Sequence, residues 1–197
     1  MSGSAQKTLL VSCSIFRQEI LQLGRIVTDR CSLKFLDSML HMHPHRLDTM
    51  LHRVTRTAAR PLLLVYGDCC PHMGDLAKLP QVRKVPGLNC CDIILGHDAY
   101  RRLRRESAFF FMPEWTGRWE EVFRRELGLE SQDLAREFMH EMHKRLVYLD
   151  TGLTETPYET LADIEAFFDM PVTVMHPGLD QLKAAILNGL ERLDHYA

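Results

Sequence analysis

The sequence has none of the short motifs that identify common nucleotide-binding or hydrolytic sites. The glycine patterns GxGxxG and GxxxxGK[ST] and the serine motif GxSxG are all absent from its 197 residues. The first two patterns cradle phosphates and the third exposes a nucleophilic serine, so their absence argues against dinucleotide-binding, P-loop and serine-hydrolase functions. The sequence also contains no internal repeat and no low-complexity segment.

A strong net charge and a long apolar N-terminal segment are missing as well. The 24 Lys and Arg residues nearly balance the 26 Asp and Glu residues, giving a net charge of −2. This balance provides no electrostatic case for binding nucleic acid or an anionic membrane. Residues 1–7 are mostly polar and lead into the first predicted strand without the apolar stretch of a signal peptide or membrane span. We therefore expect a cytoplasmic protein without a nucleic-acid or membrane partner.

The length and composition are typical of a soluble globular protein. Hydrophobic residues make up 46% of the chain and charged residues 25%, which is ordinary for a folded domain with a substantial core. We predict a single α/β domain over residues 1–197. The six cysteines include two adjacent pairs but no CxxC ribbon. In a reducing compartment such thiols are metal-binding, catalytic or buried, so we expect no disulfide framework.

Apolar stretches alternate with segments of helical spacing along the chain. Strands are predicted at 8–13, 32–40, 62–66, within 83–94, and at 108–112, 146–149 and 172–175. Helices are predicted at 14–23, 46–59 and 75–79, from 96–98 onward, and at 119–127, 131–144, 158–168 and 179–193. This alternation predicts an α/β fold with a mostly parallel, Rossmann-like sheet and helices on both faces. Residues 108–112 are uniformly apolar, which favours a central strand.

Several thiols fall at or just past the ends of predicted strands. Parallel strands bring their carboxyl ends to one edge of the sheet, where ligands bind in open α/β folds. Because successive side chains of a strand point to opposite faces, one member of each adjacent cysteine pair is expected to enter a common site. Three thiolates and an imidazole form a tetrahedral zinc set, and three thiolates alone can hold an iron–sulfur cluster with one open iron. The candidate ligands are Cys13, His41, one of Cys69 and Cys70, and one of Cys90 and Cys91.

Less specific explanations compete with a metal site. Free cysteine is among the most buried residue types, so these thiols could be inert core residues. His140 and His143 resemble a zincin motif only superficially, since they lie at i and i+3 where the motif requires i and i+4. Solvent-facing positions on a helix account for them better. The arginines of residues 101–105 favour a solvated helix face.

Five segments together resemble the DUF1638 family, a group of uncharacterised proteins. The segments are Val11-Ser12-Cys13 with Glu19 after it, Leu40-His41-Met42-His43-Pro44, Val65-Tyr66-Gly67-Asp68-Cys69, Cys90-Cys91-Asp92-Ile93-Ile94-Leu95-Gly96 and Phe110-Phe111-Met112-Pro113-Glu114-Trp115. The resemblance covers roughly residues 8–190. The residues that recur in the family correspond to Cys13, His41, Cys69 and Cys90 of this sequence.

The chain departs from the family pattern at two positions. Cys70 stands where the family commonly has glycine, and Asn89 where it has aspartate. The extra thiols leave open which member of each cysteine pair binds a metal. Relatives are often encoded among corrinoid-dependent methyltransferase systems, so the resemblance implies a role in one-carbon transfer with a corrinoid protein or methyltransferase as partner.

These observations lead us to expect a cytoplasmic metal-binding protein with zinc as its cofactor. Zinc would serve methyl transfer to or from a thiol or corrinoid, because a zinc-bound thiolate stays ionised near neutral pH while remaining nucleophilic. In that role Cys13, Cys69 and Cys90 hold the ion, and His41 is a fourth ligand or a proton acceptor. The alternative is a non-catalytic metal or iron–sulfur carrier, or an accessory protein for a corrinoid enzyme.

Overall fold

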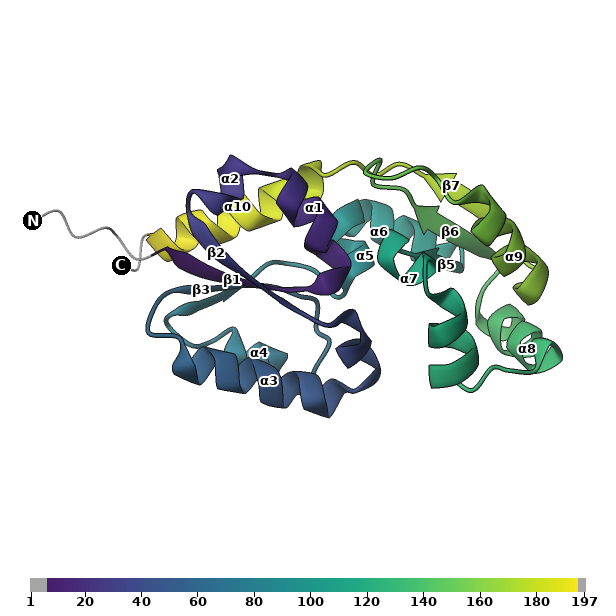
Figure 1. Ribbon diagram of the computed structural model, residues 1–197, viewed down its shortest axis with the longest axis horizontal. Coiled ribbons are helices and arrows are strands. Elements are labelled where there is room, and N and C mark those ends of the chain that lie inside the picture. The colour runs from purple at the N-terminus through teal and green to yellow at the C-terminus, as the bar shows by residue number, and fades with distance from the viewer. Residues whose placement is uncertain (1–6, 195–197) are drawn as a thin grey trace, which may run out of the picture. The chain divides into compact units, whose positions relative to one another are not determined.

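The computed structural model describes residues 7–194, which form two compact units with one parallel sheet each (Figure 1). The first unit contains the chain up to Ile93 and returns from Asp180 onward, and the second spans Ile94–Leu179. The predicted α/β class with parallel strands and flanking helices is confirmed, with the strands divided between two sheets. The prediction of one domain over residues 1–197 stays a prediction.

The first unit is built on a four-stranded sheet with the order β2-β1-β3-β4 and parallel pairing throughout. Its strands are β1 (Thr8–Cys13), β2 (Cys31–Leu36), β3 (Leu62–Val65) and β4 (Val82–Lys84). Its helices are η1 (Ser14–Phe16), α1 (Arg17–Gln22), α2 (Arg25–Thr28), η2 (Ser38–Met42), α3 (Pro44–Thr57), α4 (Met73–Leu76), α5 (Cys90–Leu95, which continues past the unit boundary) and α10 (Asp180–Asp194).

The strand order creates a topological switch point between β1 and β3. From β1 the chain moves outward to β2, then returns to form β3 on the opposite side of β1, and continues outward to β4. Loops that leave neighbouring strands in opposite directions open a crevice at the carboxyl edge, where ligands of doubly wound folds bind. In the register of this pair Ser12 lies opposite Val65, so the residues that follow them lie at the switch point.

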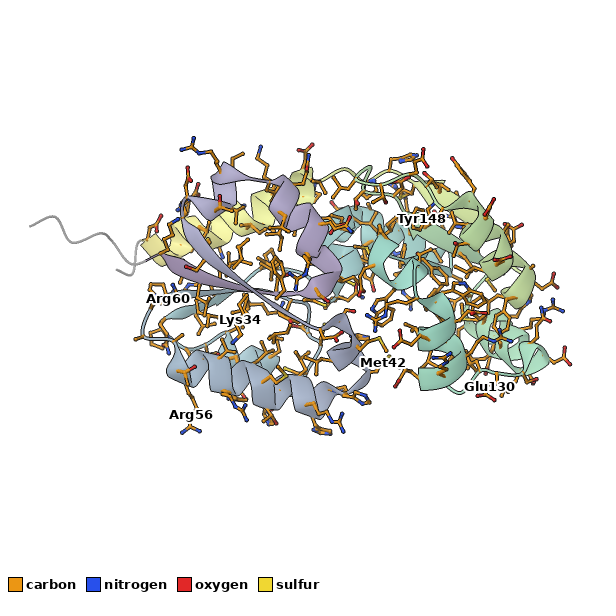
Figure 2. The ribbon with its side chains drawn as sticks, in the orientation of Figure 1. Lys34, Met42, Arg56, Arg60, Glu130 and Tyr148 are labelled. Carbon is orange, nitrogen blue, oxygen red and sulfur yellow. The ribbon has the colours of Figure 1, made fainter. Side chains whose placement is uncertain are left out.

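Helices cover both faces of this sheet (Figure 1). Alternate residues of β1 and β3 pack with α3 and α4 in one apolar cluster. The labelled side chain of Arg56 on α3 points away from that cluster (Figure 2). On the other face α10 packs against β3. Gly189 permits this approach, because a Cβ there would lie 2.5 Å from the Cδ1 atom of Leu63. The cluster contains Val11, Leu36, Leu47, Leu51, Val54, Leu62, Leu64, Tyr66, Cys70, Met73, Leu76 and Val82.

The second unit contains a three-stranded parallel sheet with the order β5-β6-β7. Its elements are α6 (His97–Arg105), β5 (Ala108–Phe111), α7 (Pro113–Thr116), the π-helix η3 (Glu121–Glu126), α8 (Gln132–Met142), β6 (Arg145–Leu149), α9 (Tyr158–Phe168) and β7 (Val172–Met175). Aromatic rings fill much of its core, with Phe123 in contact with Phe109, Phe111 and Phe168 at centroid distances of 5.2–5.8 Å. Such pairs add to the stabilisation that burial provides.

Three predictions about individual elements are wrong. The strand at 108–112 lies at the edge of its sheet, and its apolar character reflects contacts such as those of Phe109 with Phe123 and His143. The strand sought within 83–94 is β4, which begins at Val82 and ends at Lys84, so Cys90 begins a helix. The strand predicted at 32–40 ends at Leu36 and is followed by η2.

Among the described residues, no helix combines the length and the apolar character that crossing a lipid bilayer requires.

Cys31 at the start of β2 provides a test of how burial affects a thiol far from the carboxyl edge. The residue is 3% exposed, and burial raises its pKa to about 11 from 9.0. The unfolded chain therefore loses this proton at lower pH than the folded chain, so the contribution to stability is complete below pH 9 and is lost as the pH rises toward 11. We expect the stability gap between the wild type and Cys31→Ala to shrink by about 2 kcal/mol from pH 8 to pH 10.5.

Urea unfolding followed by circular dichroism at both pH values measures this gap. A gap that stays constant would show that the Cys31 thiol ionises in the fold as it does in the unfolded chain.

Candidate metal centre

The carboxyl edge of β1 and β3 brings together three cysteines and a tyrosine. Cys13 ends β1, and Tyr66 directly follows β3, one position beyond the last register pair of the two strands. Cys69 follows three residues later, and both Cys13 and Cys69 pack against the apolar cluster under α3 and α4. The thiols of Cys13, Cys69 and Cys70 are close enough to Tyr66 to influence its ionisation. Cys13 and Cys69 thus lie beside the same tyrosine and apolar cluster, and their predicted role as ligands of one ion stays a prediction.

A tight contact between two loops brings Cys90 to the same place. The Asp68 N–H donates a hydrogen bond to the Leu88 carbonyl oxygen at 2.8 Å. A Cβ on Gly67 would lie only 2.3 Å from the Asn89 Cα atom, so only glycine permits this approach. The Cys69 and Cys90 thiols, which follow these loops, interact electrostatically. We use the name switch-point site for Cys13, Cys69, Cys90 and Tyr66.

The Tyr66 hydroxyl is the unusual polar group of this site. Tyr66 is 3% exposed, and within residues 7–194 its buried hydroxyl has no hydrogen-bond partner. Burial, followed by the electrostatic effect of the nearby Cys13, Cys69 and Cys70 side chains, raises the pKa of Tyr66 far above the ordinary value. The phenol therefore remains a neutral O–H donor. A buried donor without an acceptor costs roughly 1–3 kcal/mol, so the Tyr66 hydroxyl is the polar group of this edge that the described residues leave unsatisfied.

Burial keeps the thiols of Cys69 and Cys90 in their neutral form. Desolvation, and then the nearby Cys90 thiol, raise the pKa of Cys69 to about 11. The pKa of Cys90 also lies well above its ordinary value, because Cys91 shares a hydrogen bond with it and because it is buried. Lys84, which lowers the pKa of Cys69 only in part, forms an ion pair with Asp68 at 3.2 Å. Stable thiolates at this edge therefore require a further positive charge.

Neither adjacent cysteine pair lies on a strand, so the alternation of strand side chains does not decide which way their thiols point. Cys69 and Cys70 lie in the loop after β3, where Cys70 hydrogen-bonds the Asp48 side chain and Cys69 interacts with Cys90. Cys90 and Cys91 lie on α5 with their sulfur atoms 3.9 Å apart. Cys69 is thus the better placed member of the first pair.

His41 lies in η2, five residues after the end of β2. The preceding Leu40 packs against the same apolar cluster as Cys13 and Cys69. The side chain of His41 is exposed, yet partial desolvation lowers its pKa. A neutral imidazole is the form that a metal ligand or proton acceptor needs. Its place among the predicted ligands stays a prediction.

Sequence reasoning missed the roles of Tyr66, Gly67 and Lys84. Tyr66 and Gly67 were read as the end of a strand and a turn, which is what their types usually indicate. An aromatic residue with a polar group at the carboxyl end of a buried strand is the signal that identifies Tyr66. Lys84 ends β4 and was assigned to a longer strand.

The sequence was then compared with known proteins. The model of a family described as "Protein of unknown function (DUF1638)" matches residues 35–186 of the 197-residue chain. The chain belongs to the DUF1638 family. No curated protein and no solved structure matches it. The matched range of this DUF1638 protein includes His41, Cys69 and Cys90, whereas Cys13 lies before it.

Gly67 provides a test of the contact that joins the two loops. A methyl group there must displace the backbone at Asn89, so Gly67→Ala should lower the free energy of unfolding by about 1–3 kcal/mol. Gly74 in α4 has no atom within 4 Å of its would-be Cβ, and alanine favours a helix. Gly74→Ala should therefore leave stability unchanged or raise it slightly. Equal effects of the two substitutions in urea unfolding would contradict the contact.

Proposed function

We propose that this protein binds a metal ion at the switch-point site and serves methyl transfer to or from a thiol or a corrinoid. Cys13, Cys69 and Cys90 would hold the ion, which we take to be zinc, and His41 would be a fourth ligand or a proton acceptor. The observation that supports the proposal most directly is the buried Tyr66 hydroxyl, which lacks a partner among the described residues and has thiols beside it.

The Tyr66 hydroxyl fits the outer shell of a thiolate-bound metal. A neutral thiol is a poor acceptor, whereas a metal-bound thiolate is an anionic one that a phenol O–H can satisfy. Hydrogen bonds from outer-shell donors to metal ligands fix their orientation and tune their basicity. Burial of the hydroxyl thus becomes favourable once Cys13 or Cys69 carries a negative charge.

The donor chemistry of the site also fits a thiophilic ion. Burial raises the pKa of Cys69 to about 11, so these thiols stay protonated unless a positive charge displaces their protons. When bound, zinc would keep sulfur ionised yet nucleophilic near neutral pH, which alkyl transfer requires. The protein's own contribution is to hold Cys13 on a rigid strand end and to shield the site with the apolar cluster.

The alternative is a non-catalytic carrier of a metal or an iron–sulfur cluster, or an accessory protein for a corrinoid enzyme. Three thiolates that leave one iron open fit the same residues. Elemental analysis and the absorption spectrum of anaerobically purified protein separate these functions: zinc without colour supports the first, and a broad visible thiolate–iron band supports a cluster. Loss of the methyl group from methylcobalamin in the presence of a thiol distinguishes catalysis from storage. Metal-free, inactive protein would contradict both.

Removal of one sulfur ligand tests the assignment of the site. Cys69→Ser should abolish metal retention without unfolding the chain, since serine keeps the shape of the side chain but does not form a thiolate. Cys31→Ala is the matched control, because Cys31 lies at the opposite end of its strand. Metal content is measured by elemental analysis after gel filtration. Full stoichiometry in Cys69→Ser would exclude this cysteine as a ligand.

Removal of the Tyr66 hydroxyl should affect stability and metal binding in opposite directions. Tyr66→Phe eliminates an unmet buried donor, so the metal-free protein should gain on the order of 1 kcal/mol of stability. The same change removes an outer-shell partner, so metal affinity should fall by roughly 10–100-fold. Urea unfolding and competition with a chelator measure the two quantities.

Tyr158→Phe removes a hydroxyl from a residue that is 70% exposed and should change neither quantity. A loss of stability in metal-free Tyr66→Phe would show that the hydroxyl already has an acceptor in the fold.

A further inference from the structure

A second group of metal-binding side chains lies on α3 and on the loop that precedes α4. Asp48 and His52 are four residues apart on α3, so they occupy the same face of the helix. His72 directly precedes α4. One potential ligand atom from each of these three side chains lies within 4.8 Å of the other two.

The separations between these atoms agree with a shared ion. The Asp48 Oδ2 atom lies 3.0 Å from His72 Nδ1 and 3.7 Å from His52 Nε2. Two donor atoms that bind one ion at roughly 2.1 Å lie about 3.0–3.4 Å apart. The pair of Asp48 and His72 already meets this spacing, and the His52 nitrogen, at 3.7 Å, lies slightly beyond it on a side chain that is 43% exposed.

The carboxylate of Asp48 is held in place by groups outside the three ligands. Its Oδ1 atom accepts a hydrogen bond from the His72 backbone N–H at 3.2 Å, which leaves Oδ2 facing both imidazoles. The Cys70 thiol also hydrogen-bonds this side chain. Asp48 itself is 15% exposed. Such outer-shell contacts orient the carboxylate before an ion arrives.

We propose that Asp48, His52 and His72 form a second metal site, separate from the switch-point site, for a divalent first-row transition ion such as zinc. Two imidazoles and one carboxylate are a ligand set that suits such ions. Three protein ligands leave coordination positions open, and the exposure of His52 and His72 opens those positions to water or a small ligand. An exposed ion pair alone would contribute little to stability, which gives the arrangement no strong structural purpose.

Zinc titration of metal-free, nitrogen-15-labelled full-length protein tests the proposal. Histidine ring signals in two-dimensional NMR should shift for His52 and His72, and the variants His52→Gln and His72→Gln assign them. His45 lies exposed on the same helix outside the group, so its ring signal should not move. Unchanged His52 and His72 signals throughout the titration would overturn the site.

Affinity measurements on variants provide the second readout. Loss of a group that only supports a metal ligand already costs roughly 10–100-fold in metal affinity. Asp48→Asn and His52→Gln alter proposed ligands directly, so each should weaken zinc binding at this site by at least about tenfold. His45→Gln is the matched control and should bind zinc as the wild type does. Wild-type affinity in Asp48→Asn would also overturn the site.

Cobalt separates this site from the switch-point site. Cobalt bound by thiolates gives a near-ultraviolet charge-transfer band, which a site of nitrogen and oxygen ligands lacks. Cys69→Ser should remove that band while the His52 and His72 signals still respond to zinc. Absence of the band in the wild type would count against the switch-point site alone, and loss of the histidine response in Cys69→Ser would overturn a separate second site.

Discussion

The contact of Gly67 with the backbone at Leu88 and Asn89 determines which side chains meet at the carboxyl edge. Strand pairing fixes Cys13, the last residue of β1, and Tyr66, which directly follows β3. Pairing does not reach Cys69 or Cys90, which lie in loops and at a helix start. A Cβ at residue 67 would come within 2.3 Å of Asn89, where ordinary contacts begin at 3.4 Å. The approach of the loop that holds Cys69 to the loop before Cys90 therefore depends on the lack of a Cβ atom at Gly67.

The apolar cluster beneath these thiols sets their chemistry. Leu36, Leu64 and Met73 belong to the cluster against which Cys13 and Cys69 pack, and desolvation is the main reason that the pKa of Cys69 rises. Lys84 cannot offset this effect, since its ammonium group already pairs with Asp68 and donates to the Val85 and Gly87 carbonyl oxygens. The fold thus keeps the thiols of Cys69 and Cys90 in their neutral form near neutral pH.

The sequence predicted elements with clear periodicity and sharp ends. The strands Thr8–Cys13 and Val172–Met175 and the helix Tyr158–Phe168 have the predicted limits. Ser131, where the helix at 131–144 was predicted to begin, caps α8 by accepting a hydrogen bond from the Leu134 N–H. The limits of short elements were harder to predict. For example, β4 has three residues and no sequence pattern that separates it from the loop after it. Division of the strands between two sheets depends on long-range pairing, which local patterns do not encode.

The thiols of the candidate site were predicted from topology and resemblance, but their surroundings were not. Parallel strands predict that Cys13 and Cys69 share an edge, and both pack against the apolar cluster of β1, β3, α3 and α4. Within residues 7–194 the Tyr66 hydroxyl has no hydrogen-bond partner, and because this depends on every neighbour in three dimensions, no sequence spacing reveals it. Asp48 and His52 have a helical spacing that sequence can show, whereas the approach of His72 arises only from packing of α3 against α4.

The neighbouring residues Cys69 and Cys70 lie in one loop but interact with different polar groups. Cys69 faces Cys90, while Cys70 hydrogen-bonds Asp48 on α3. A glycine at position 70 would leave Asp48 with one fewer hydrogen-bond partner near its carboxylate, so the second thiol is more than a spare ligand for the first site. Cys70 therefore helps to hold Asp48 in place, while the charge of Cys69 is coupled to that of Cys90.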